Sequence, residues 1–111
     1  MPLSFDDEIN SREDLRAVLG EPTARTRNKA ADRIDDVFAR FIATSPFMLV
    51  ASHGADGTVD ISPKGDPAGF VAVLDPHTLA IPERPGNRRG DTFENVLEDP
   101  NVGLIFLVPG H

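Results

Sequence analysis

The feature that most constrains this chain is a pair of consecutive strand–turn–strand patterns between residues 47 and 82. FMLVASHGADGTVDIS has two β-type runs around GADG, and GFVAVLDPHTLAIP repeats the arrangement around DPHT. Aspartate at the first position and proline at the second position of DPHT are typical of a turn. The run VGLIFLVPG predicts a final strand, and its nearly continuous apolar character predicts burial on both faces.

Helices are predicted ahead of these strands. Ser11, followed by Asp14 at the third helical position, is close to a capping box, and Gly20 follows the expected end of the first helix. Pro22 then permits a new helix start. The stretch KAADRIDDVFARFIATSP predicts a helix limited by Pro46, because its apolar residues recur at spacings of three and four: Ala30, Ile34, Val37, Phe38, Phe41 and Ile42.

One short helix is predicted between the hairpins and the last strand. GDTFENVLEDPN has Phe93, Val96 and Leu97 on one side and ends before Pro100. Antiparallel hairpins with a single late helix favour a small barrel with helices outside, a mainly β or α+β fold. We expect one domain, in which residues 1–45 form an N-terminal helical segment and residues 46–111 form the barrel portion.

Composition narrows the classes of function. The 111 residues suit a single core, and the net charge of −7 argues against generic binding to nucleic acid or to anionic lipid. Cysteine is absent, which excludes disulfides and thiolate metal sites. The start MPLSFDDEIN does not have the form of a signal peptide, and no apolar run approaches the roughly 20 residues of a membrane span. We therefore expect a cytoplasmic protein.

Positive charge is nevertheless concentrated in RPGNRRGDTFENV, residues 84–96. Asn87, Arg88 and Arg89 precede the short helix, and Thr92 adds a hydroxyl in its first turn. Guanidinium groups and a helix N-terminus are both suited to a phosphate, so this loop is a candidate phosphate site. The alternative is a solvated loop whose arginines pair with Asp91 and Glu94, and the sequence weighs the two about equally.

Lys64 is a second basic residue that could contact the same phosphate. Ser62 and Lys64 are two residues apart in DISPKGDPAGF, so both side chains point to one face of a strand. Lys64 beside a hydroxyl is a plausible second arm for the same anion, and Pro63 between them requires a strand edge or end. The spacing of the three histidines does not resemble a metal site, and the serines lack a glycine elbow, so we predict no catalytic or metal-binding residue.

The segments FIATSPFMLVASHGADGTVDISPKGDPAGFV and IPERPGNRRGDTFENVLEDPNVGLIFLVPG resemble the pyridoxamine 5′-phosphate oxidase-like, FMN-binding split-barrel family. They are most similar to a bacterial branch whose members are regarded as FMN-dependent enzymes. The similarity runs from about Phe41 to Gly110, and its most specific pieces are SPKGD, IPERPGNRR and ENVLEDPNVGLIF. It implies an antiparallel, Greek-key-like split barrel that forms a homodimer, with FMN bound at the subunit interface.

The same resemblance implies the roles of several residues. The family's basic phosphate-binding segment falls on Asn87, Arg88 and Arg89, and a basic group of an earlier strand falls on Lys64, with Ser62 beside it. The strand that leads to the basic loop runs beside the flavin ring in such barrels, which makes Ile81 and Pro82 candidates for backbone contacts. Relatives continue with strands that close the barrel and hold pyridoxamine phosphate, so we expect an incomplete barrel here and assign no substrate.

The residue patterns and the family resemblance leave three hypotheses for the function. The first is an FMN-dependent oxidoreductase acting on a small molecule, in which the flavin performs the redox chemistry and the protein binds it. The second is a non-enzymatic flavin-binding or sensing module; a deazaflavin in the same pocket ranks lower because its charged tail would need more basic residues. The third is a truncated chain that has the fold but no bound cofactor.

Overall fold

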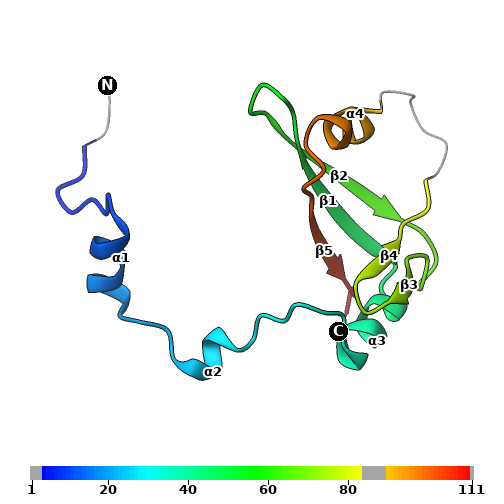
Figure 1. Cartoon of the computed structure of the whole chain (residues 1–111), viewed down its shortest axis with the longest axis horizontal. Coiled ribbons are helices and arrows are strands. Elements are labelled where there is room, and N and C mark those ends of the chain that lie inside the picture. Colours follow the sequence, from blue (N-terminus) through cyan, green and yellow to red (C-terminus); the bar gives the residue numbers. More distant parts are fainter. Residues whose placement is uncertain (1–3, 84–89, 111) are drawn as a thin grey trace. The chain divides into compact units, whose positions relative to one another are not determined.

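A computed structural model gives the structure of the protein and describes residues 4–83 and 90–110 (Figure 1). The chain divides into two compact units, Met1–Ala31 and Asp32–His111. None of the helices in the described ranges is long and apolar enough to cross a membrane.

The first unit contains helix α1 (Arg12–Leu19) and the single turn α2 (Ala24–Arg27). The Ser11 hydroxyl accepts a hydrogen bond from the Asp14 backbone N–H at 3.0 Å, which confirms the predicted cap. Gly20 ends α1 with a φ of 75°, a left-handed value that favours glycine. The Thr23 side chain caps α2 in the same way as Ser11 caps α1.

The second unit opens with α3 (Asp36–Thr44), which starts later than the apolar spacing predicts. Ala30 and Ile34, expected on the helix, lie ahead of it. Asp35 is the N-cap and accepts a hydrogen bond from the Phe38 N–H at 2.8 Å. The Ile34 N–H donates to the Pro76 carbonyl at 2.7 Å, so a contact with a distant turn holds this residue outside the helix.

Both predicted hairpins are present. The first pairs β1 (Phe47–His53) with β2 (Val59–Gly65), and the second pairs β3 (Ala72–Asp75) with β4 (Thr78–Ala80). The last strand, β5 (Gly103–Leu107), pairs antiparallel with β1 and gives a sheet in the order β2–β1–β5. The antiparallel α+β class is therefore confirmed, but the described strands form two small sheets and not a closed barrel.

Figure 1 shows where α3 and α4 (Asp91–Glu98) lie along the three-stranded sheet. The end of α3 and the β3–β4 hairpin lie near the start of β1, and α4 lies near its end, where it packs on β1 and β2. Pro63 lies in β2, an edge strand of this sheet, where a missing N–H is tolerated. The predicted short helix is confirmed as α4.

The core of this unit is small. Its buried apolar side chains come from α3, from the inner face of β1 and from the segment ahead of β3: Ile42, Met48, Val50 and Val71. Ser45, between α3 and β1, is also fully buried. Its hydroxyl lies 2.7 Å from both the Phe47 and the Leu107 carbonyl oxygens, and its single proton is donated to one of them at a time. Ser45 thereby joins the end of α3 to β1 and β5.

The sequence prediction for β5 is wrong in one respect. Burial alternates along this strand: Leu104 and Phe106 face the core, whereas Ile105 and Leu107 are 57% and 44% exposed. Val59 and Ile61 of β2 are also exposed, at 57% and 65%. We call Val59, Ile61, Ile105 and Leu107 the outer apolar face. Helix α3 and the β3–β4 hairpin supply packing partners to the inner face of the sheet, so the apolar run of β5 is covered only on that side.

Candidate functional site

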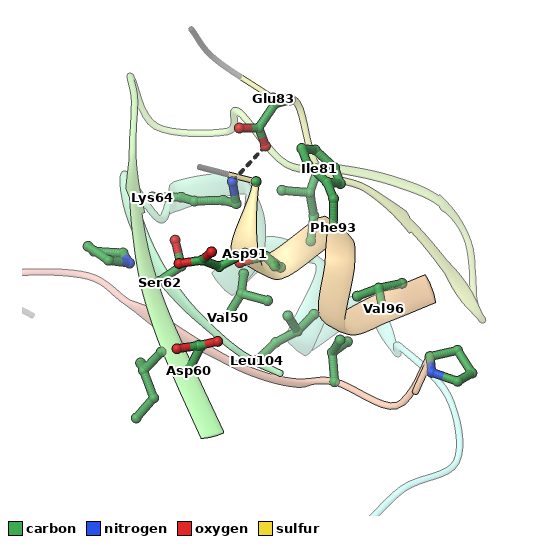
Figure 2. A pocket seen from close by; sticks show the side chains of 16 residues that line it. Val50, Asp60, Ser62, Lys64, Ile81, Glu83, Asp91, Phe93, Val96 and Leu104 are labelled. Atoms are coloured by element: carbon green, nitrogen blue, oxygen red, sulfur yellow. Dashed lines mark hydrogen bonds and ion pairs between the residues drawn. The ribbon is translucent and has the colours of Figure 1, made fainter. Parts of the chain in front are cut away.

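A cleft of about 650 Å³ lies between the inner face of the three-stranded sheet, α4 and the segment that follows β4 (Figure 2). This volume is within the range of small-ligand and cofactor sites. The residues that line the cleft are Val50, Asp60, Ile61, Ser62, Pro63, Lys64, Ile81, Glu83, Gly90, Asp91, Thr92, Phe93, Val96, Pro100, Val102 and Leu104.

The strand register explains why one wall is polar and the floor is apolar. Val50 of β1 lies opposite Ser62 of β2 on one side and opposite Leu104 of β5 on the other. Lys64 and Asp60 lie one pleat to either side of Ser62, and Figure 2 shows the three following one another along β2. The inner face thus presents a row of three polar side chains beside a floor formed by Val50 and Leu104.

Lys64 does not stand free in the cleft. Its ammonium Nζ lies 2.9 Å from Oε2 of Glu83, and Figure 2 shows this ion pair at the rim. The Lys64 side chain is only 20% exposed, whereas that of Glu83 is 54% exposed. The lysine is therefore held by the sheet, and its partner approaches from the solvent side.

Helix α4 contributes its first turn to the opposite wall. Gly90 precedes the helix with a φ of 66°, a conformation that glycine adopts at no steric cost, and Asp91, Thr92 and Phe93 follow. The apolar side predicted for this helix is wrong in part. Val96 is half-buried and lines the cleft, but Phe93 and Leu97 are 56% and 86% exposed. The helix meets the sheet through a polar residue instead.

That residue is Asn95. Its amide Nδ2 donates to the Ser52 hydroxyl at 3.0 Å and to the Asp60 carboxylate Oδ2 at 2.7 Å. Ser52 is fully buried on β1, directly opposite Asp60 of β2. One amide group therefore joins α4 to two strands and holds the Asp60 carboxylate at the edge of the cleft. Asn95 is a positioning residue for this wall.

The structure brings together most of the predicted site residues that it describes. Ser62, Lys64, Ile81 and Thr92 all line the cleft, although they come from three separate segments of the chain. Pro82 is half-buried next to Ile81 but does not line the cleft. The predicted phosphate residues Asn87, Arg88 and Arg89 lie outside the described residues.

Sequence reasoning missed the acidic members of the site. Asp60 precedes Ser62 by the same two-residue spacing that separates Ser62 from Lys64. Extending the pattern by one pleat would therefore have placed Asp60 on the same strand face. Glu83 lies within the IPERPGNRR segment, but only uncharged and basic residues of that segment were predicted as ligand contacts. Asn95 lies three residues after Thr92, a spacing that places both on one helix face. Within the described lining, the cations are outnumbered: three carboxylates, Asp60, Glu83 and Asp91, accompany Lys64.

The fold and the cleft together define a small antiparallel α+β domain with a cleft on the inner face of its three-stranded sheet. A comparison with protein-family models matches residues 34–110 to pyridoxamine 5′-phosphate oxidase. Because this match covers more than half of the chain, the chain belongs to the pyridoxamine 5′-phosphate oxidase family. Searches of curated proteins and of solved structures returned no significant match.

Proposed function

We propose that the protein is an FMN-dependent oxidoreductase of the pyridoxamine 5′-phosphate oxidase family that acts on a small molecule. The observation that carries this proposal is the convergence of Ser62, Lys64, Ile81 and Thr92 on one cleft of about 650 Å³. Members of this family are usually FMN-dependent oxidoreductases, and the cleft has a size and lining suited to such a ligand.

The lining fits the parts of FMN. An apolar floor of Val50 and Leu104, with Ile81 on the wall, suits the flat isoalloxazine ring. Lys64 is a cation for the phosphate, and Arg88 and Arg89 are the further cations expected from the sequence. The hydroxyls of Ser62 and Thr92 supply hydrogen-bond partners. FMN, when bound, would supply the redox chemistry, and the protein would position the ring and set its electrostatic surroundings.

No side chain is required as an acid or a base under this proposal. The polar groups Lys64, Ser62 and Thr92 are binding residues, and Asn95 positions the wall that carries Thr92. Asp60 is fixed by Asn95 at the end of the β2 row, which suits it to accept a hydrogen bond from a bound ligand.

The first test is the visible absorption spectrum of the purified protein before and after addition of FMN and desalting. The chain has neither Trp nor Tyr, so the protein contributes little absorption beyond the far ultraviolet. We expect retained flavin bands. A colourless protein after desalting would contradict the proposal and leave the family membership as a statement about fold.

A second measurement separates an enzyme from a flavin-binding module. FMN-loaded protein is mixed anaerobically with NADH or NADPH in a stopped-flow instrument, and bleaching of the flavin is followed. Bleaching faster than that of free FMN is expected for the oxidoreductase. Retained flavin that bleaches no faster than free FMN with either donor would favour the non-enzymatic module.

We also propose a homodimer with the cofactor at the subunit interface. The outer apolar face supports this proposal, because four large side chains exposed by 44–65% on one sheet face form a surface that a partner would cover. Ile61 belongs to this face and also lines the cleft, so a second copy on the face would border the ligand.

The oligomeric state tests this part directly. Analytical ultracentrifugation should give a dimer for the wild type and a monomer for Ile105→Lys. Leu97→Lys, which places the same charge on an exposed leucine of α4, should remain a dimer. A monomeric wild type at micromolar concentration would contradict the dimer without bearing on flavin binding to one chain.

A further inference from the structure

Lys64 is the only cation among the described residues that line the cleft, and it is already paired. Oε2 of Glu83 lies 2.9 Å from its ammonium group, so the positive charge of this lysine is already partly compensated when a negatively charged ligand approaches. A further carboxylate, Asp60, lines the same cleft and adds to the negative charge near this lysine.

The two partners of the ion pair differ in how firmly they are held. Lys64 lies within β2, paired through Met48 to the centre of the sheet, and its side chain is 20% exposed. Glu83 follows Pro82 beyond the end of β4, outside any strand, and its side chain is 54% exposed. When the pair separates, Glu83 can turn into water, whereas Lys64 stays in the cleft.

We propose that Glu83 is a built-in competitor for the anion site at Lys64, so that a phosphate monoester binds by exchange with the Glu83 carboxylate. A phosphate carries close to two charges and three acceptor oxygens against the single charge of a carboxylate, which favours the exchange. The inference rests on the proposed function for its choice of FMN, but the exchange itself concerns any phosphate monoester or free phosphate.

Two consequences distinguish exchange from simple addition. First, Glu83 weakens the binding of every ligand that uses Lys64 as its cation and leaves a flavin without a phosphate unaffected. Second, exchange replaces one ion pair with another, so phosphate binding to the wild type depends less on salt than binding to a chain without Glu83. A residue with a merely structural role would not change this salt dependence.

The experiment uses the full chain and three variants. Glu83→Gln removes the competing charge at constant shape. Glu98→Gln makes the same change in net charge at the far end of α4, away from the cleft. Lys64→Met combined with Glu83→Gln removes the cation as well. Far-ultraviolet circular dichroism first verifies that all four proteins have the same fold.

Inorganic phosphate is titrated into each protein, and the backbone amide signals of Lys64 and its neighbours on β2 are followed by NMR. An ion pair of this exposure accounts for about a two- to fivefold change in affinity. We therefore expect Glu83→Gln to bind phosphate about two- to fivefold more tightly than the wild type, with a steeper dependence on sodium chloride. Glu98→Gln should match the wild type, and the double variant should lose the gain.

Equal affinities of Glu83→Gln and the wild type would overturn the inference, as would an equal gain in Glu98→Gln or a gain that survives Lys64→Met. Parallel titrations with FMN and riboflavin separate this result from the proposed function. Glu83→Gln should tighten FMN binding and leave riboflavin unchanged. A wild type that binds neither flavin would refute the flavin assignment, while the phosphate titration would still decide the role of Glu83.

Discussion

Replacing Asn95 with alanine removes the amide that joins α4 to the sheet. In the native structure this amide donates to Ser52 at 3.0 Å and to the Asp60 carboxylate at 2.7 Å. The variant leaves a fully buried hydroxyl and a half-buried carboxylate without that donor. We expect the free energy of unfolding to fall and the first turn of α4 to lose its fixed position beside the cleft.

The magnitude follows from the two bonds. A hydrogen bond to a charged group contributes about 1.5–3 kcal/mol and a neutral one about 0.5–1.5 kcal/mol. Alanine is a better helix former than asparagine, which offsets about 0.5 kcal/mol of the loss. The net loss is therefore about 1.5–4 kcal/mol, a large part of the stability of a domain with so few buried apolar side chains.

Urea denaturation measures this loss. Far-ultraviolet circular dichroism is the appropriate signal because the chain has neither Trp nor Tyr. Protein concentration is held constant, since self-association would shift the midpoint. Glu94→Ala, at the neighbouring exposed position of α4, is the control and should change stability by less than about 0.5 kcal/mol. A loss in Asn95→Ala no larger than that of the control would refute the role assigned to the amide.

Three other predictions concern the loop, the core and the second hairpin. Arg88→Ala should weaken FMN binding by about tenfold or more, as expected for one charge-assisted contact to the phosphate, and an unchanged affinity in a titration would rule out that contact. Ser45→Ala should lower the free energy of unfolding by about 1–3 kcal/mol, because two part-buried carbonyl oxygens lose their shared donor, and an unchanged urea midpoint would contradict this. Hydrogen bonds from the His77 backbone N–H and from the Thr78 hydroxyl lower the pKa of Asp75 from its ordinary value of 3.8. The ionised carboxylate of Asp75 therefore stabilises the folded state above pH 3.8, and this stabilisation is lost as the pH falls through the lowered pKa. Below pH 3.8 the free energy of unfolding of Asp75→Asn should accordingly fall less steeply with decreasing pH than that of the wild type. The same pH dependence in both proteins would count against the turn contacts.

Elements set by local chemistry could be predicted from the sequence. The cap at Ser11 and the turn at Asp75 depend on side chains that bond to backbone groups two or three residues away, so short motifs suffice. The two hairpins could be predicted for the same reason. The start of α3 could not be predicted, because the apolar spacing continues back to Ala30 while a bond from Ile34 to the distant Pro76 keeps that segment out of the helix.

Burial was harder to predict than element type. The apolar run of β5 suggested cover on both faces, but a sheet gains cover only where another layer packs on it, and here the described layers lie on the inner side. For the same reason the contact face of α4 was misjudged. Its exposed leucine, Leu97, looked like a packing residue, whereas the helix is attached through Asn95.

In the candidate site, too, the features set by local periodicity could be predicted, whereas those set by tertiary contacts could not. Strand periodicity predicted that Ser62 and Lys64 share a face, and their place in the cleft agrees with that rule. The pairing of Lys64 with Glu83 depends on how the end of the second hairpin meets the first, which no local motif encodes. The roles of Asn87, Arg88 and Arg89 remain predictions from the sequence.

The order of strands in the sheet has a consequence for synthesis of the chain. The central strand β1 pairs with its hairpin partner β2 soon after both are made, but its other neighbour, β5, is the last of the described strands along the chain. At translation rates of about 5–20 residues per second, the free edge of β1 waits on the order of 3–10 s for β5. During that interval the nascent chain has an open sheet edge able to pair with another chain. This edge of β1 is therefore open to another chain only before β5 completes the cleft.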